Sequence, residues 1–354
     1  MHDGNRCGYR LGHFGIHVNR YLLLTVDFPP DFIGGVSAWA HDLATGIAQS
    51  GASISVFAKR TGNTKTHDDA LPYGVDRIRG RSWNRWQALW MRLALHRKLT
   101  QNTTVIAATW RLATHITQQI EHTGAKLGVA FHGSEITHLE TAPRELHRVV
   151  DAAHALLPVS QFLKDELIRL QLVTHDDPRL HVLPMALNTE FKPQETRSKE
   201  LICIARPTEL KGIDRAVKLA HALGRTLHLV GPENAPTGCI AHGTLPREQT
   251  LTLLAKSAAC VLLPRTLENG RGAEGLGLAL LEAAVRGVPS IGCSTGGVPE
   301  ALGPGLLLTE PDEPNVSTVQ QWLEHPGRGQ AARDWVCNVH GPTHALSALT
   351  RAFL

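Results

Sequence analysis

Two glutamates in the second half of the chain enclose a glycine-rich segment that opens a predicted helix. Glu274 precedes Gly275, Leu276 and Gly277, and seven residues separate it from Glu282. A Gly-x-Gly sequence at a helix N-terminus leaves backbone amides that can hold a diphosphate. A carboxylate inside that helix is a natural acceptor for the two hydroxyls of a ribose. An unpaired acid among apolar neighbours is costly when buried, so we interpret Glu282 as a ligand-binding residue.

Two cations follow the apolar run at 201–205. Arg206 comes directly after this run, and Lys211 precedes Gly212 and the next predicted helix. Cations at the carboxyl end of a strand suit a pair of phosphates. By themselves such charges more often lie on a solvated surface, but together with the segment at 274–277 they favour a nucleoside-diphosphate site.

A second glycine-rich loop, residues 28–36, joins the first predicted strand to the first predicted helix. It contains Gly34 and Gly35. Glycines permit a positive φ and allow a ligand to approach the backbone closely. The helix N-terminus beyond them offers free N–H groups. A plain tight turn explains the same residues, so this loop alone is not decisive.

Short apolar runs alternate with helical segments along the chain, which predicts parallel sheets covered by helices. In the first half we expect turns over 59–76, strands at 21–26, 53–57, 104–108, 127–131, 155–159 and 180–184, and helices at 36–49, 83–98 and 161–170. In the second half we expect strands at 201–205, 227–230, 260–264 and 289–292, and helices at 212–223, 246–257 and 277–286. The three motifs therefore fall in loops after strands, where ligands of such sheets bind.

The alternation restarts after a polar linker near residues 188–198. This predicts an α/β protein with two Rossmann-like, doubly wound domains facing across a cleft. We place a loose extension at 1–19, the first domain at 20–193 and the second from 194 onward.

Composition excludes several classes of protein. The 354 residues are 42% hydrophobic and carry a net charge of +4, which argues against disorder and against a nucleic-acid binder. The longest apolar runs fall short of the ~18 residues of a membrane helix, and the first run is too short for a signal peptide, so we expect a cytoplasmic protein. The 6 cysteines form no C-x-x-C pair, and the 20 histidines show no metal-ligand spacing.

A basic segment with tryptophans stands apart from these motifs. Residues 77–120 contain no acidic residue. Trp83, Trp86 and Trp90 recur at helical spacing, with Arg85 and Arg92 on roughly the opposite face. Such a helix suits an anionic membrane surface or a charged lipid acceptor. The alternative is that the tryptophans pack on the sheet and the arginines are solvated.

Taken together, these motifs resemble a known enzyme family. The Glu-x7-Glu segment, residues 294–300, Arg206 with Lys211, and the loop at 28–36 are similar to retaining glycosyltransferases of the GT-B fold, glycosyltransferase family 4. Residues 264–277 are similar to its phosphatidylinositol mannosyltransferase branch. Residues 183–191 resemble the family's interdomain segment, but Met185 and Ala186 replace its usual Asn-Gly, so that glycine's backbone contact is not carried over.

The resemblance implies roles for individual residues. Arg206 and Lys211 neutralise the donor diphosphate, Glu282 binds the ribose, and Glu274 holds the donor sugar. The implied donor-binding set is Gly34, Gly35, Arg206, Lys211, Glu274, Gly275, Leu276, Gly277, Leu278 and Glu282. His132 matches the family's active-site histidine and completes a catalytic set with Arg206, Lys211 and Glu274, although a core or capping histidine explains it equally.

The resemblance also implies an activity. A sugar passes from a nucleotide-diphosphate sugar, UDP- or GDP-linked, with GDP-mannose among the candidates, to a hydroxyl of a glycan or lipid-linked acceptor, with retention. Residues 20–193 bind the acceptor, residues 194–338 bind the donor, and a C-terminal helix at 339–354 crosses back to the first domain. The resemblance implies that the enzyme needs no cofactor besides the nucleotide sugar. The chain has no D-x-D, so we expect no metal.

Two other functions use the same architecture. One is a nucleotide-sugar epimerase, and the other is a catalytically inactive subunit that binds a nucleotide sugar. The basic segment adds one further expectation, a peripheral contact with an anionic membrane at the inner face of the cytoplasmic membrane.

Overall fold

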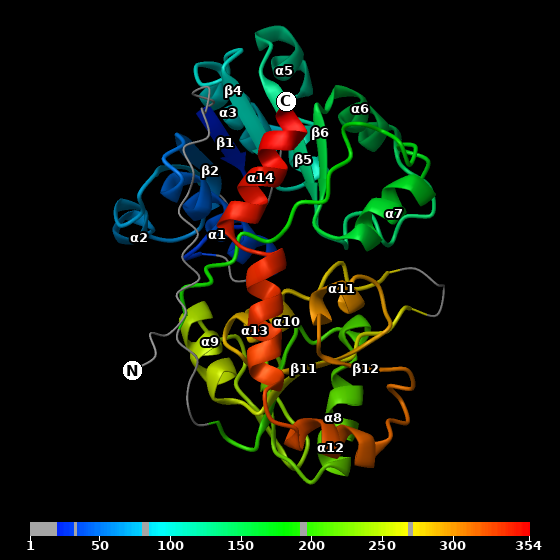
Figure 1. Ribbon diagram of the computed structural model, residues 1–354. Helices are drawn as coiled ribbons and strands as arrows, with labels where there is room; N and C mark the ends of the chain where they lie inside the picture. The colour runs from blue at the N-terminus through cyan, green and yellow to red at the C-terminus, as the bar shows by residue number, and fades with distance from the viewer. Residues whose placement is uncertain (1–19, 32–33, 80–84, 192–196, 268–271) are drawn as a thin grey trace, which may run out of the picture. The chain divides into compact units, whose positions relative to one another are not determined.

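The computed structural model describes residues 20–31, 34–79, 85–191, 197–267 and 272–354. The expected extension at 1–19 and Trp83 lie outside these residues. In the described part of the chain, contacts separate two compact units, each drawn as a sheet with helices in Figure 1. Unit 1 comprises described residues up to Val159, Leu163–Asn188 and His340–Leu354. Unit 2 comprises Ser160–Phe162 and Thr189–Val339.

Unit 1 is built on a parallel sheet with the strand order β3-β2-β1-β4-β5-β6. Its strands are β1 (Arg20–Leu24), β2 (Ile54–Arg60), β3 (Gly74–Arg79), β4 (Thr103–Ala107), β5 (Lys126–Phe131) and β6 (Ala155–Pro158). Leu22 of β1 pairs with Ser55 on one side and Val105 on the other. The central strands are apolar because helices cover both faces.

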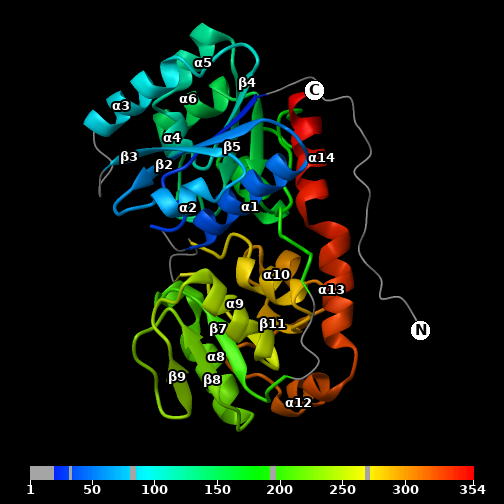
Figure 2. The same ribbon diagram turned by 90° about the vertical axis from the view of Figure 1, so that its left-hand side faces the viewer.

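The helices of unit 1 bury apolar stripes against this sheet. They are α1 (Gly35–Gln49), α2 (Lys65–Asp69), α3 (Arg85–His96), α4 (Trp110–Ala113), α5 (Thr117–Thr123), α6 (Arg144–Ala152), α7 (Gln161–Arg169) and α14 (Pro342–Phe353). Trp39, Leu43 and Ile47 recur every four residues along α1 and are buried. Figure 2 shows α14 beside α1, where a Cβ on Gly46 would lie 3.0 Å from that of Pro342.

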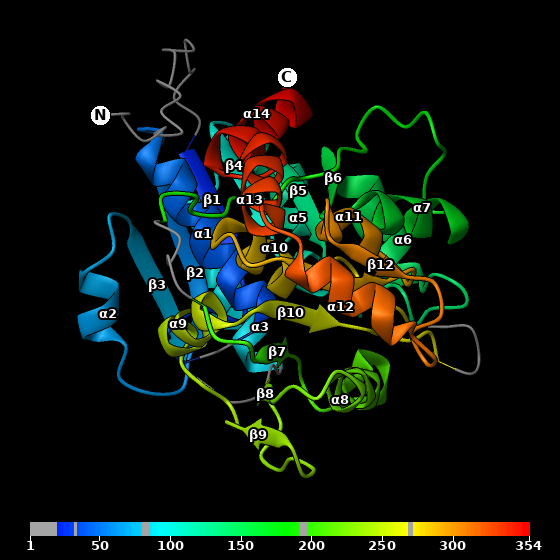
Figure 3. The ribbon, with the colours of Figure 1, turned by 60° about the horizontal axis from the view of Figure 1, so that its bottom comes forward.

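Unit 2 repeats the topology, with the strand order β12-β11-β10-β7-β8-β9. Its strands are β7 (Leu201–Ile204), β8 (Leu227–Val230), β9 (Cys239–Ala241), β10 (Ala259–Leu262), β11 (Ser290–Cys293) and β12 (Leu306–Leu308). Strand β8 pairs with β7 on one side and β9 on the other, and Figure 3 labels the three strands. The helical segments are the 3-10 turn η1 (Glu209–Lys211), α8 (Ile213–Ala222), α9 (Arg247–Lys256), α10 (Leu278–Val285), α11 (Val298–Leu302), α12 (Val316–Glu324) and α13 (Arg328–Val339).

The elements expected from the sequence agree with the structure in the sheet centres and differ at the edges. Residues 59–76, expected as turns, include α2, the end of β2 and the start of edge strand β3. The polar sequence of β3, Gly-Val-Asp-Arg-Ile-Arg, lacks the apolar run that marks a central strand. The strand expected at 180–184 was wrong, because only Leu180 forms an isolated bridge, to Leu156.

Each sheet has one point where the strand order reverses direction. In unit 1 this point lies between β1 and β4, and in unit 2 it lies between β7 and β10. Loops leaving the carboxyl ends of such strands diverge to opposite faces and leave room for a ligand. The loops after these four strands are therefore where a binding site is expected.

Candidate active site

The carboxyl ends of β7 and β10 bring two predicted site residues of unit 2 together. Lys211 ends η1 after β7, and its Nζ donates a hydrogen bond to Oε2 of Glu274 in the loop after β10. Sixty-three positions separate the two residues in the chain. Arg206 lies in the same loop as Lys211 and is exposed. The predicted cations and the first glutamate thus gather at one edge of this sheet.

The second glutamate lies inside α10. Gly277 precedes this helix with φ 99°, a conformation that favours glycine, and no side chain caps the helix N-terminus. Leu276 is buried and Leu278 is half-buried beside it. Glu282 is five positions after Gly277, about 7–8 Å along the helix axis. Its Oε1 accepts hydrogen bonds from Nη2 and Nε of Arg247, at 3.0 and 3.3 Å.

Glycines without space for a side chain hold the loops of this site together. A Cβ on Gly212 would lie 1.9 Å from the carbonyl oxygen of Leu263, in the loop after β10. A Cβ on Gly297 would lie 2.2 Å from the carbonyl oxygen of Gly275, and its N–H donates to the carbonyl of Glu274 at 2.8 Å. The loops after β7 and β11 therefore support the loop after β10 by direct backbone contact.

In unit 1, His132 follows β5 and presents one unpaired nitrogen. Desolvation lowers its pKa to about 4, although a hydrogen bond to the backbone of Ala108 acts in the opposite direction. The ring is therefore neutral near pH 7. Nε2 is buried without a hydrogen-bond partner in the described part of the chain. We therefore assign the ring proton to Nδ1, which donates to the Ala108 carbonyl, and this leaves Nε2 as an acceptor. The edge of the ring packs against Trp39, with ring centroids 4.5 Å apart.

Glu135 holds the turn that carries His132. Its carboxylate accepts the N–H of His132, and its carbonyl accepts Nε1–H of Trp110 at 3.3 Å. Burial raises the pKa of Glu135, against hydrogen bonds from the backbone of His132 and Gly133. Glu135 therefore ties the turns after β4 and β5 to each other.

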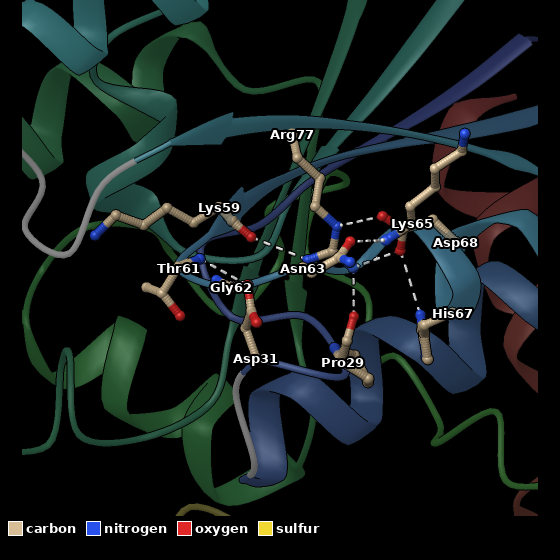
Figure 4. Close-up of polar contacts among 10 residues, drawn as sticks. All are labelled: Pro29, Asp31, Lys59, Thr61, Gly62, Asn63, Lys65, His67, Asp68 and Arg77. Carbon is tan, nitrogen blue, oxygen red and sulfur yellow. Dashed lines mark hydrogen bonds and ion pairs between the residues drawn. The ribbon is translucent and has the colours of Figure 1, made fainter.

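The loop after β1 is held by part-buried and exposed polar contacts (Figure 4). Arg77 of β3 binds both carboxylate oxygens of Asp68, at 2.7 and 2.8 Å, and donates to the carbonyls of Pro29 and Lys59. Asp31 accepts from the N–H groups of Thr61 and Gly62, at 2.7 and 3.3 Å. These contacts position the chain just before Gly34.

Neither Gly34 nor Gly35 adopts the left-handed conformation that glycine permits. Gly34 has φ 162°, which is extended backbone that any residue adopts. A Cβ on Gly34 would meet nothing within 4 Å in the structure, and Gly35, like Gly34, is exposed. What glycine provides at Gly34 is open space above the N-terminus of α1 rather than an unusual conformation.

A pocket of about 640 Å³ opens where the strand order of unit 1 reverses. It is lined from the end of β1, the turn after β4 and the start of α6, by Val26, Thr109, Trp110, Arg111, Leu112, Thr114, His115, Pro143 and Glu145. The guanidinium of Arg111 lies 4.6 Å from the centroid of the Trp110 ring. The pocket is therefore lined by apolar, hydroxyl-bearing and charged side chains together.

Helix α3 exposes an apolar face. Trp90 is 63% exposed and Leu93 57%, and Leu89 is also exposed. Met91 and Leu95 are buried on the side that packs against the unit. The alternative in which this face packs on the sheet is therefore wrong at Trp90 and Leu93. Arg92 is exposed, whereas the side chains of Arg85 and Trp86 lie outside the description.

Two cations of the basic segment are neutralised by acids from outside it. Arg77 pairs with Asp68, and Lys98 pairs with Asp76. Among the described residues, no group of His, Cys, Asp and Glu could hold a metal ion, and no helix is long and apolar enough to cross a membrane.

Two family profiles match the chain in succession. The profile of Glycosyltransferase Family 4 matches residues 33–191, and that of Glycosyl transferases group 1 matches residues 187–336. The chain is a family 4 glycosyltransferase with the GT-B fold. Both the predicted family and the predicted α/β fold class are thereby confirmed, and the enzyme uses a nucleotide-sugar donor.

Curated relatives extend over nearly the whole glycosyltransferase. A Corynebacterium glutamicum protein, the GDP-mannose-dependent monoacylated alpha-(1-6)-phosphatidylinositol monomannoside mannosyltransferase, is 24% identical and aligns with 90% of this chain and 95% of its own. A Mycobacterium tuberculosis protein, the GDP-mannose-dependent alpha-(1-6)-phosphatidylinositol monomannoside mannosyltransferase, is 25% identical. It aligns with 90% of this chain and 94% of its own.

Solved structures share the fold of the glycosyltransferase. AviGT4, a glycosyltransferase involved in avilamycin A biosynthesis, superposes with a TM-score of 0.68 at 17% identity, over 94% of this chain and 97% of its own. The Anabaena protein HepE, in complex with UDP and glucose, superposes with a TM-score of 0.69 at 16% identity, over 95% of this chain and 100% of its own.

The predicted site residues of the glycosyltransferase fall into two groups, one on each unit. Gly34, Gly35 and His132 lie on unit 1, and the remaining donor-binding residues lie on unit 2. Sequence reasoning missed Arg247 and Glu135. Glu135 stands three positions after His132, a spacing at which a side chain reaches back to a turn amide. Nothing in the sequence connects Arg247 with Glu282, because 35 positions separate them.

Proposed function

We propose that the enzyme transfers a sugar, with retention and without a metal, from a GDP-linked donor such as GDP-mannose to a lipid-linked acceptor. The observation that carries the donor site is the Lys211–Glu274 pair at the strand-order reversal of unit 2, with Glu282 in the helix that starts beside it. The names of the two mannosyltransferase relatives support GDP-mannose.

Unit 2 supplies the groups that act on the departing diphosphate. In the transfer, the bond from the anomeric carbon to the phosphate oxygen breaks while the acceptor oxygen bonds to that carbon from the same face. The acceptor proton goes to the departing phosphate oxygen. Arg206, Lys211 and the N-terminal amides of α10 stabilise the charge that grows on the diphosphate. Glu274 binds the sugar hydroxyls, and Glu282 binds the ribose.

His132 contributes a hydrogen bond and no charge. Its low pKa and the assigned tautomer leave Nε2 as an acceptor near neutral pH. A sugar hydroxyl is the natural donor to such an atom. His132 therefore orients a substrate hydroxyl and does not act as a general acid.

The acceptor belongs on unit 1, in the pocket at the carboxyl ends of β1 and β4. Thr109 and Thr114 offer hydroxyls, Arg111 offers a cation, and Trp110 forms part of the apolar wall. These groups suit a hydroxylated headgroup with an attached phosphate. The relatives act on phosphatidylinositol mannosides, which supports a headgroup of this kind.

Binding and turnover together test this function. A thermal-shift panel of GDP, UDP, ADP and their sugars should single out GDP and GDP-mannose, because ligand at 100 times its Kd adds about 2.7 kcal/mol. Transfer from GDP-mannose to phosphatidylinositol mannosides, with the product anomer assigned by NMR, should give the α product. Isomerised donor without transfer indicates an epimerase, and binding without any reaction indicates an inactive subunit. Either result overturns the proposal.

The exposed face of α3 suits the surface of an anionic membrane. Trp90, Leu93 and Leu89 present apolar side chains, with Arg92 exposed on the same helix and Arg97 exposed directly after its end. Each cation near an anionic bilayer contributes about 1 kcal/mol, screened by salt. We therefore expect reversible binding that brings a lipid-linked acceptor to unit 1.

Vesicle co-sedimentation tests this contact. The wild type should bind phosphatidylglycerol-containing vesicles at low salt and release them at high salt. Trp90→Ser with Leu93→Ser, or Arg85→Glu with Arg92→Glu, should abolish the binding. The control pair Ile240→Ser with Leu307→Ser removes exposed apolar side chains from unit 2 and should leave it unchanged. Wild-type protein that ignores the vesicles excludes the membrane contact.

A further inference from the structure

Arg247 and Glu282 form an ion pair that joins two helices of unit 2. Arg247 is the first residue of α9, and Glu282 lies in the middle of α10; Figure 2 shows the two helices next to each other. Two hydrogen bonds from the guanidinium, donated by Nη2 and Nε, end on the same carboxylate oxygen, Oε1, at 3.0 and 3.3 Å.

The surroundings of Glu282 explain why the pair matters. Glu282 is 7% exposed, and its chain neighbours Leu281 and Ala283 are fully buried. Burial disfavours the ionised form of a carboxyl group unless a cation is near. A protonated carboxyl becomes a donor and loses part of its capacity to accept hydrogen bonds. A ribose diol brings two donors, so binding it requires the ionised form.

The geometry of the pair also fixes the direction of the carboxylate. Two N–H groups of one guanidinium converge on Oε1, which restricts rotation about the last side-chain bond of Glu282. An ionised carboxylate has about four lone-pair positions, so contact with Arg247 at one oxygen is compatible with a bound diol. Arg247 itself is anchored at the start of a helix, where its backbone is held by the helical hydrogen bonds.

We infer that Arg247 is a positioning residue for the donor nucleotide, which keeps the Glu282 carboxylate ionised and directed at the ribose hydroxyls. This inference rests on the proposed function of unit 2 as the donor site. On this inference, Arg247 and Glu282 together distinguish ribose from deoxyribose, and Glu282 alone does not.

Nucleotide binding to the full-length protein tests the inference without any turnover. Calorimetric titrations use GDP, 2′-deoxy-GDP and 2′,3′-dideoxy-GDP. We expect the wild type to bind GDP about tenfold or more tightly than the dideoxy nucleotide, because hydrogen bonds to a charged group are lost with the hydroxyls. In Arg247→Ala, GDP binding should weaken to the dideoxy level, while dideoxy-GDP binding stays within about twofold of the wild type.

Two further variants separate positioning from structure. Arg247→Lys keeps a cation and should retain part of the preference for ribose. Lys256→Ala removes an exposed cation from the other end of α9 and should change neither affinity nor preference. An Arg247→Ala protein that keeps the full ribose preference overturns the inference, as does equal binding of all three nucleotides by the wild type. A wild type that binds no guanosine nucleotide instead overturns the proposed donor.

Discussion

Two carboxylates of the proposed donor site have different cationic partners. Glu274 is paired with Lys211, which the sequence motifs already indicated as a site residue. Glu282 is paired with Arg247, which no sequence motif indicated. A substrate phosphate competes with Glu274 for the ammonium of Lys211, because both are anions. In the proposed function, Lys211 therefore turns to the donor phosphate while Glu274 turns to the donor sugar.

The first prediction concerns this cation. Lys211→Ala should reduce turnover by about 10²-fold or more, because one preorganised donor to the developing charge is lost. Lys218→Ala, an exposed lysine of α8, should keep full activity. Turnover with saturating donor measures the effect, and circular dichroism checks that the fold is intact. Full activity in Lys211→Ala removes this residue from the phosphate site.

Two buried histidines of unit 1 connect stability with pH. Desolvation, together with the nearby charge of His344, lowers the pKa of His340 to about 4, and desolvation does the same for His132. Between pH 6.5 and 4 the unfolded chain binds protons that the native histidines do not, so stability falls as the pH falls. Each histidine accounts for up to roughly 3 kcal/mol over this window.

The second prediction uses His340, whose Nδ1 accepts the N–H of Met185 at 3.1 Å. His340→Asn keeps an acceptor near that position but does not titrate. The free energy of unfolding should therefore fall less between pH 7.5 and pH 4.5 in the variant than in the wild type. Urea denaturation at the two pH values measures the difference. An identical pH dependence contradicts the assignment.

At the scale of elements, close backbone contacts join the loops of the proposed donor site. Gly297 follows β11 and touches the backbone of Gly275 in the loop after β10, and Gly212 touches Leu263 in the same way. Each contact leaves no room for a Cβ. The loops that present Lys211, Glu274 and the N-terminus of α10 are therefore packed directly against one another.

The third prediction follows from the contact of Gly297. This residue has φ −80°, which alanine adopts freely, so Gly297→Ala isolates the collision of the new Cβ with Gly275. The free energy of unfolding should fall by about 1–3 kcal/mol, and nucleotide binding should weaken. Chemical denaturation and calorimetry measure the two effects. Gly74→Ala, where a Cβ meets nothing within 4 Å, is the control. A variant as stable as the wild type refutes the argument.

At the scale of the whole molecule, one topology occurs twice with different loops. Both units have the same strand order, and in each the loops at the reversal point carry the polar features of the site. In unit 2 these loops present cations and helix amides. In unit 1 they form a pocket with apolar and hydroxyl-bearing walls. The division matches an anionic donor on one unit and a larger acceptor on the other.

The fourth prediction concerns the electrostatics of the complete enzyme. In the proposed function, Arg206, Lys211 and the N-terminus of α10 take the electrostatic role that a metal has in other nucleotide-sugar enzymes. Transferase activity should therefore survive EDTA, and added Mg²⁺ or Mn²⁺ should not increase it. Loss of activity on chelation, restored by either ion, contradicts the proposal.

Most of the fold could be predicted from the sequence, and so could the loops that carry the proposed donor site. Apolar runs marked the central strands because a parallel sheet is buried on both faces, and the glycine-rich loops after them marked the helix N-termini. Edge strands such as β3 escaped detection, because one side of an edge strand is solvated and its sequence is correspondingly polar.

The tertiary structure decided which groups are partners and which faces are exposed. Helical spacing grouped Trp90 with Leu93 but left open whether that stripe packs inward; the structure buries Met91 and Leu95 instead, because one helix can cover the sheet with only one face. Likewise, the pairs Arg247–Glu282 and Arg77–Asp68 form between separate elements. A linear pattern reports what a residue can do along its own element, whereas burial and pairing depend on which elements the fold brings together.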